Sequence, residues 1–149
     1  MATRKRKVSV AKLPMQRQFA FSDQGRIHNL RAIFDKLNAK YFRKRLKDYT
    51  IVWGRRRRIR PRDEIVFGSI QEEDRVIRIH PLLDRAIVPA WFVEYVVYHE
   101  MCHAVVADQY DSAGRRVIHH AKFYERERRF HWFRRAKAWE DENLGRFLR

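Results

Sequence analysis

The sequence predicts a single α+β domain, in which a small sheet of about three strands packs with an N-terminal helix, a buried central helix and a C-terminal helix. The chain has 149 residues, enough for one domain with a hydrophobic core. Apolar residues make up 45%, and five Gly and four Pro are too few for a low-complexity chain. Segments with helical periodicity flank short runs of β-branched and aromatic residues, which indicates the mixed class.

The N-terminal part of the chain divides into an arm and a helix. Residues 1–20 contain no acidic residue and little periodicity, which is typical of a disordered basic arm, so the predicted domain spans residues 21–149. Ser22 or Asp23 is expected to cap the helix that follows, and this helix is expected to run to about residue 45. Its apolar residues recur at spacings of three and four: Ile27, Leu30, Phe34, Leu37 and Tyr41.

Three short strands are expected next. Residues 49–53 are β-branched and aromatic, residues 64–70 alternate partly, and residues 76–80 end before a proline. Between the first two strands, residues 55–62 form a long basic loop. These strands form the small predicted sheet.

The remainder of the chain predicts two helical regions. Pro89 is placed where a helix can begin, and residues 90 to about 109 are apolar nearly all round, so this helix belongs in the middle of the domain. Residues 111–114 break it. A last helical region starts near His119 and directs three aromatic residues inward: Phe123, Phe130 and Phe133.

Composition restricts the class of protein. The single cysteine, Cys102, excludes an intramolecular disulfide and a four-cysteine zinc ribbon in this chain. No run approaches 18 apolar residues, and the basic N-terminus lacks the apolar core of a secretory signal. We therefore expect an intracellular, cytoplasmic protein that is associated with a nucleoid or nucleus if it binds nucleic acid.

The charge predicts a polyanionic partner. Lys and Arg number 34 against 18 Asp and Glu, which gives a net charge of +16. Nucleic acid is the usual partner of so basic a domain, and a solvated surface that only maintains solubility is the alternative. Basic segments are expected at residues 4–7, at residues 55–62 and in the last helix. The arginines are interleaved with four aromatic residues: Trp53, Tyr124, Trp132 and Trp139. This combination suits the binding of unpaired bases, although core packing is the expected role of at least half of these aromatic residues.

One motif carries metal chemistry. His99, Glu100 and His103 form the pattern HExxH inside the apolar helix. Residues four apart share one helical face, so the two imidazoles can bind one metal ion while Glu100 accepts a proton from water at that ion. The alternative is a buried helix that contains two histidines by chance. Cys102 is expected to be a buried small hydrophobe rather than a ligand.

A catalytic zinc site needs a third protein ligand. The metzincin continuation requires Gly and His three and six residues after the second His, where this chain has Val106 and Gln109, so that class is excluded. Spacing alone does not choose among the candidates, which begin the last helical region: His119, His120, Glu125 and Glu127. For either histidine, a buried or capping role is the alternative.

Residues 99–104 (HEMCHA) and 119–123 (HHAKF) together resemble the SprT-like (Spartan) metalloprotease family, whose pattern is HExxH followed by a later His-Gly-x-x-Phe. Residues 30–42, 51–53 and 76–83 resemble the opening helix and the strands before the metal helix of that family. The resemblance extends from about residue 25 to 133. It implies a zincin-like fold.

The resemblance also implies site residues and a function. It makes His99, His103 and His119 the Zn²⁺ ligands and Glu100 the general base of a zinc metalloendopeptidase. With the basic charge, it points to hydrolysis of DNA-bound or DNA-crosslinked proteins and a role in DNA repair, with non-specific nucleic-acid binding and a monomeric state. His120 replaces the family's Gly, and the cysteine-rich ribbon of many members is absent. The competing hypothesis is a basic nucleic-acid-binding protein with a structural or vestigial zinc site and no protease activity.

Overall fold

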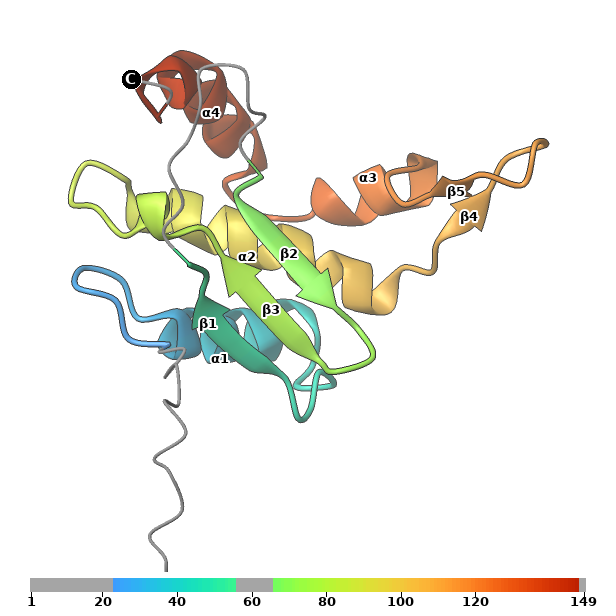
Figure 1. The fold of residues 1–149 in the computed structure, drawn as a ribbon, viewed down its shortest axis with the longest axis horizontal. Coiled ribbons are helices and arrows are strands. Elements are labelled where there is room, and N and C mark those ends of the chain that lie inside the picture. Colours follow the sequence, from blue (N-terminus) through green and yellow to red (C-terminus); the bar gives the residue numbers. More distant parts are fainter. Residues whose placement is uncertain (1–22, 56–65, 148–149) are drawn as a thin grey trace, which may run out of the picture.

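A computed structural model describes residues 23–55 and 66–147 (Figure 1). The predicted basic arm, the candidate cap Ser22 and the basic loop apart from Arg55 lie outside these ranges. The elements, in chain order, are α1 (Leu30–Tyr41), β1 (Thr50–Trp53), β2 (Gly68–Gln71), β3 (Val76–Ile79), the 3-10 turn η1 (Pro81–Leu83), α2 (Ala90–Val105), β4 (Gln109–Tyr110), β5 (Arg116–Val117), α3 (Ala121–Glu127) and α4 (Phe133–Phe147). The predicted α+β class is confirmed.

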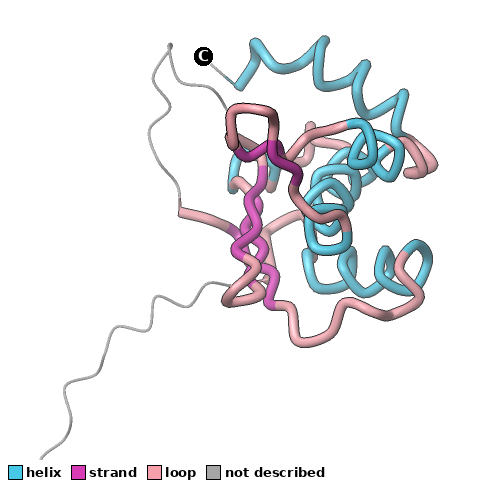
Figure 2. Tube along the Cα trace, turned by 90° about the vertical axis from the view of Figure 1, so that its right-hand side faces the viewer, coloured by secondary structure: helices cyan, strands magenta, loops and turns pink. Residues whose placement is uncertain are grey.

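The main sheet has three strands in the order β1-β3-β2. β1 runs parallel to β3, with Ile51 opposite Ile77, and β2 runs antiparallel to β3, with Ile70 opposite the same Ile77. In Figure 2 the strands form one layer and the helices that pack against it lie on one side. Because β3 is central, β2 lies at an edge of the sheet among the described strands.

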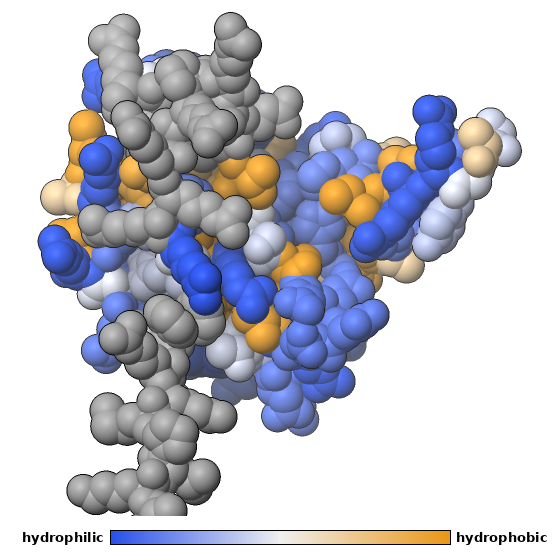
Figure 3. All heavy atoms as spheres, viewed as in Figure 1, coloured by the Kyte–Doolittle hydropathy of each residue, from blue (hydrophilic) through white to orange (hydrophobic). Residues whose placement is uncertain are grey.

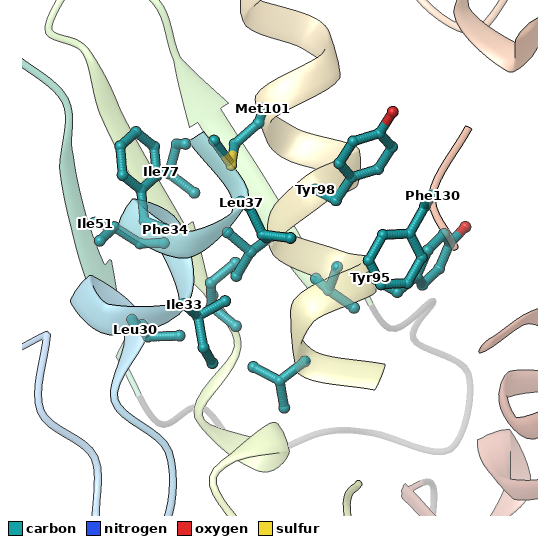
Figure 4. Close-up of a cluster of buried hydrophobic side chains, with 14 of the residues drawn as sticks. Leu30, Ile33, Phe34, Leu37, Ile51, Ile77, Tyr95, Tyr98, Met101 and Phe130 are labelled. Atoms are coloured by element: carbon teal, nitrogen blue, oxygen red, sulfur yellow. The ribbon is translucent and has the colours of Figure 1, made fainter. Parts of the chain in front are cut away.

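The hydrophobic core lies between this sheet and the helices α1 and α2 (Figure 4). Nine of the 16 residues of α2 are buried, because the helix is covered by the sheet, α1, α3 and α4. The prediction of a central helix is therefore correct. Within the described part of the chain, no helix combines the length and hydrophobicity needed to cross a bilayer. Side chains of α2 that point out of this core are therefore carried by a helix whose backbone is fixed by packing on several sides.

The expected limits of the first helix are wrong at both ends. Asn29, and not Asp23, is the N-cap, and its side-chain oxygen accepts a hydrogen bond from the backbone N–H of Ala32 at 3.0 Å. The preceding residues cannot be helical because the carboxylate of Asp84 accepts the backbone N–H groups of residues 26–28. At the other end, positive φ angles at residues 43 and 44 stop the helix.

Two other predicted boundaries also need correction. The central helix ends at Val105 instead of near residue 109, and the predicted break is the turn of the β4–β5 hairpin, where Gly114 has φ +77°. The last helical region is two helices, α3 and α4. Between them, single-turn hydrogen bonds join Phe130 N to Glu127 O and Phe133 N to Phe130 O. This turn buries Phe130 and partly buries Phe133, as their expected inward direction requires.

Candidate metal centre and cleft

Three histidine side chains converge at one point of the surface. His99 and His103 lie one turn apart on α2, and His119 comes from the segment between β5 and α3. The Nε2 atom of His119 lies 3.2 Å from Nε2 of His99 and 3.1 Å from Nε2 of His103. A tetrahedral zinc ion with Zn–N bonds of 2.0–2.1 Å separates its nitrogen ligands by about 3.3 Å. Both distances fit such an ion, and the ligand atoms of all three histidines lie within 4.8 Å of one another.

Two histidines of this cluster, His103 and His119, favour the neutral form that binds metals. Burial lowers the pKa of His103 to about 4, and charge on His99 and His119 adds to the effect. Burial, followed by charge on His99, also lowers the pKa of His119. Metal ligation requires unprotonated imidazole nitrogens, so His103 and His119 are in the metal-binding form at neutral pH.

A carboxylate orients the first histidine. The Nδ1 atom of His99 lies 2.7 Å from Oε1 of Glu127, which also accepts a hydrogen bond from the Tyr95 hydroxyl at 2.7 Å. Burial acts to raise the pKa of Glu127, but the hydrogen bonds from His99 and Tyr95 outweigh it and the pKa is lowered. The ionised carboxylate makes Nδ1 the donor of His99. The Nε2 lone pair then faces the other two histidines.

The ring of Phe123 packs against all three imidazoles of the cluster. It stacks on His103 with a centroid distance of 4.3 Å and an interplanar angle of 24°, and it also contacts His99 at 5.0 Å and His119 at 4.9 Å. Phe123 is fully buried at the start of α3. Aromatic packing on all three imidazoles restricts their rotation, so these side chains lose little further conformational entropy when an ion binds.

Glu100 lies beside the cluster against the edge strand. Its side chain is buried, with 6% of the residue exposed, and burial raises its pKa to about 7, against the opposing effect of His99. A Cβ atom on Gly68 of β2 would lie 2.8 Å from Oε1 of Glu100 and 2.9 Å from its Cγ. Only glycine at this position leaves room for the carboxylate.

The cluster opens into a cleft of about 970 Å³. One wall is formed by residues 66–73, which comprise β2 and its flanks, and α2 contributes His99, Glu100 and His103. The opposite wall runs from β5 through α3 to α4 and includes His119. In Figure 3 the described surface beside this region is mostly hydrophilic, with separate hydrophobic areas, one of them on the projecting β4–β5 hairpin. The three histidines and the carboxylate thus face an open, elongated space.

The structure separates the four candidates for a third ligand. Only His119 joins His99 and His103. Nε2 of His120 lies 2.9 Å from the Ala107 carbonyl, to which it donates, in a buried contact away from the cluster. Glu125 is exposed beside Arg129 at 3.6 Å, and Glu127 holds His99 from behind.

Two further residues of the site have no signal in the sequence motif. Tyr95 precedes His99 by one helical turn, but only the fold shows that its hydroxyl meets Glu127. Gly68 is an isolated glycine in a strand, a general indication of close approach, yet its neighbour Glu100 is far away in the sequence. As expected, Cys102 is fully buried, and burial raises the pKa of its thiol to about 12.

We expect Glu127→Gln to weaken metal binding about 10- to 100-fold without abolishing it, because loss of the orienting carboxylate leaves the three histidines in place. Competition with a chromophoric chelator measures this affinity for Zn²⁺. Glu125→Gln is the matched control, because this exposed carboxylate lies on the same helix and forms its one ion pair among the described residues with Arg129. Unchanged affinity in Glu127→Gln would show that the hydrogen bond does not support the ligand.

Comparison with known proteins gives one match. A model of the SprT-like family matches residues 30–138, which include α1, the sheet, HExxH, His119 and the first turns of α4. No curated protein and no solved structure gives a significant match.

Proposed function

Because this chain belongs to the SprT-like family, we propose that it is a zinc-dependent metallopeptidase in which His99, His103 and His119 hold the ion and Glu100 is the general base. The family is associated with zinc metallopeptidase-like proteins. The observation that carries the proposal is the convergence of three Nε2 atoms next to a buried carboxylate in an open cleft. A purely structural metal site needs neither the carboxylate nor the cleft.

The residues divide the work of hydrolysis. Zinc, when bound, supplies Lewis-acid chemistry that activates water and polarises the carbonyl of the peptide bond. Glu100 accepts the proton of the attacking water and returns it to the leaving amine. Burial raises the pKa of Glu100 to about 7, which opposes the lowering that a nearby cation causes. The carboxylate therefore stays basic enough for proton transfer.

The cleft suits an extended polypeptide. β2 pairs with β3 on one side, and its other edge belongs to the cleft wall formed by residues 66–73. An extended segment can add to such an edge through main-chain hydrogen bonds, which bind peptides with little regard to sequence. We therefore propose unfolded or flexible protein segments as substrates, and DNA-bound or DNA-crosslinked proteins as the physiological class in view of the +16 charge.

The charge also supports a second candidate, a nucleic-acid-binding protein whose zinc is structural or vestigial. This alternative gives the carboxylate of Glu100 no proton to transfer. It also does not account for the glycine at position 68, which leaves room for that carboxylate. The two candidates differ in one measurable property, metal-dependent cleavage of a peptide bond.

The test combines metal analysis with proteolysis. We expect one zinc ion per purified chain, and cleavage of casein or self-cleavage that a chelator stops and added Zn²⁺ restores. Each assay is run with and without single-stranded DNA, because a chain with a net charge of +16 is expected to bind nucleic acid. A purified chain without zinc, or cleavage that survives full removal of metal, would contradict the proposal. Zinc and DNA binding without cleavage in any assay would favour the second candidate.

A further inference from the structure

The negative charge that forms during the proposed hydrolysis needs a hydrogen-bond donor in the cleft. When water adds to a peptide carbonyl, the carbonyl oxygen becomes an oxyanion, and a donor placed at that oxygen lowers the barrier. Side chains with N–H or O–H groups line the cleft on β2, on α2 and on the opposite wall, in addition to the three histidines. Their contacts within the described part of the chain separate the donors that can serve this oxygen from those that cannot.

The donors of β2 face away from the metal centre. A Cβ atom on Gly68 would touch Glu100, so this position of the strand faces α2. Successive residues of a strand point to opposite faces, and Ser69 and Gln71 therefore have the other orientation. The Oε1 atom of Gln71 accepts a hydrogen bond from Arg78 of β3 at 3.3 Å on that outer face. These two side chains do not reach an oxyanion beside Glu100.

Three donors of the other elements are already engaged. The Tyr95 hydroxyl has a single hydrogen and donates it to Glu127 at 2.7 Å. Arg116 and Lys137 each form an ion pair with a carboxylate that also lines the cleft. Moving either cation to the oxyanion would leave its carboxylate without this partner. Two cleft-lining donors remain, and both belong to α3 or its C-cap.

Tyr124 lies on α3 beside one of the metal ligands. Its ring centroid is 6.4 Å from that of His119, with an interplanar angle of 34°. This part of α3 is placed against the metal centre, because Phe123 packs on all three imidazoles and Glu127 contacts His99. Tyr124 keeps 43% of its surface exposed and lines the cleft. Among the described residues its hydroxyl has no hydrogen-bond partner, so its hydrogen is available to a substrate.

Arg128 is the less suitable of the two remaining donors. It follows Tyr124 by one helical turn, and within the described ranges its side chain has no ring or polar contact with the three histidines, whereas Tyr124 lies beside His119. A guanidinium also carries a full positive charge, which a divalent cation at the centre repels. A tyrosine hydroxyl donates a hydrogen bond without this repulsion.

We infer that Tyr124 is a catalytic residue whose hydroxyl donates a hydrogen bond to the oxyanion of the tetrahedral intermediate, an inference that rests on the proposed peptidase function. As the water oxygen bonds to the carbonyl carbon, one water proton passes to Glu100 and the π electron pair of the carbonyl moves to its oxygen. Tyr124 shares its hydrogen with that oxygen and keeps it. When the electron pair forms the carbonyl again, the C–N bond breaks and the amine takes the proton from Glu100.

The test compares Tyr124→Phe with the wild type in three measurements: cleavage of a fluorogenic casein peptide, zinc content, and binding of the phosphinic analogue of that peptide. Loss of an oxyanion donor costs about 10²- to 10³-fold in kcat, and polarisation by the metal supplies part of the same stabilisation here. We therefore expect kcat to fall about 10- to 100-fold with unchanged KM and zinc content. The phosphinic peptide should bind more weakly by a similar factor, because its tetrahedral anion resembles the intermediate.

Tyr110→Phe is the matched control. It removes the same hydroxyl from an exposed tyrosine of the β4–β5 hairpin, outside the described lining of the cleft, and should equal the wild type in all three measurements. Circular dichroism melting verifies that each variant is folded.

Several outcomes would overturn the inference. One is a Tyr124→Phe variant that equals the wild type in kcat and in affinity for the phosphinic peptide. A rise in KM without a fall in kcat, or a loss of zinc, would assign the ring a binding or packing role instead. If Arg128→Gln weakens the phosphinic peptide more than Tyr124→Phe does, the donor is Arg128. A wild type without zinc or without cleavage would refute the proposed function itself, whereas the other results leave that function standing.

Discussion

His119→Ala is expected to remove the bound zinc, whereas His120→Ala leaves it in place. The Nε2 atom of His119 lies within 3.2 Å of both other histidines, while His120 donates to a backbone carbonyl elsewhere. Loss of an orienting carboxylate already weakens such sites about 10- to 100-fold, so loss of a direct ligand should exceed about 100-fold. Zinc content after dialysis against a weak chelator measures the difference.

His120→Ala is also the control for folding in this experiment. It removes the hydrogen bond to the Ala107 carbonyl, which should lower the free energy of unfolding by about 1 kcal/mol. A modest loss of stability with full zinc content would therefore separate a packing role from ligation. Zinc loss in His120→Ala together with zinc retention in His119→Ala would reverse the assignment.

Local patterns predicted the parts of this fold that depend on local physics. The apolar run of α2 predicted a buried helix because it has no polar face. HExxH placed two imidazoles on one face of this helix because residues four apart share a helical face. The third histidine does not follow from periodicity. Its position depends on the hairpin at Gly114 and the direction in which it returns the chain, so spacing alone left four candidates. The resemblance to the SprT-like family indicated His119, and the fold brings His119 back to α2.

The residues that support the site were beyond sequence reasoning for the same reason. Glu127 was a candidate ligand because its side chain type suits metals, and only its contact with Nδ1 of His99 shows that it acts from behind the ligand. Gly68 comes from a different strand than any motif residue. The predicted start of α1 was wrong because the carboxylate of Asp84, which is distant in sequence, accepts hydrogen bonds from the backbone N–H groups just before Asn29.

Glu100→Gln is expected to lower kcat about 10²- to 10⁴-fold while the zinc content stays at the wild-type value. Glutamine has nearly the same shape, but its amide cannot accept the proton of the attacking water. The three histidines are unchanged, so the metal is retained. Casein cleavage and zinc analysis on the same preparation measure both quantities. Full activity in this variant would exclude Glu100 as the general base.

Gly68→Ala tests the position of the same carboxylate without altering its chemistry. The added Cβ would lie 2.8 Å from Oε1 of Glu100, closer than real contacts allow, so the side chain must move. We expect a partial loss of kcat, smaller than in Glu100→Gln, with unchanged zinc content, because catalysis depends on placing the base within hydrogen-bond reach of the water. Ser69→Ala, at the neighbouring exposed position of β2, should keep wild-type kcat. If Gly68→Ala is as active as Ser69→Ala, the close approach of β2 does not position the base.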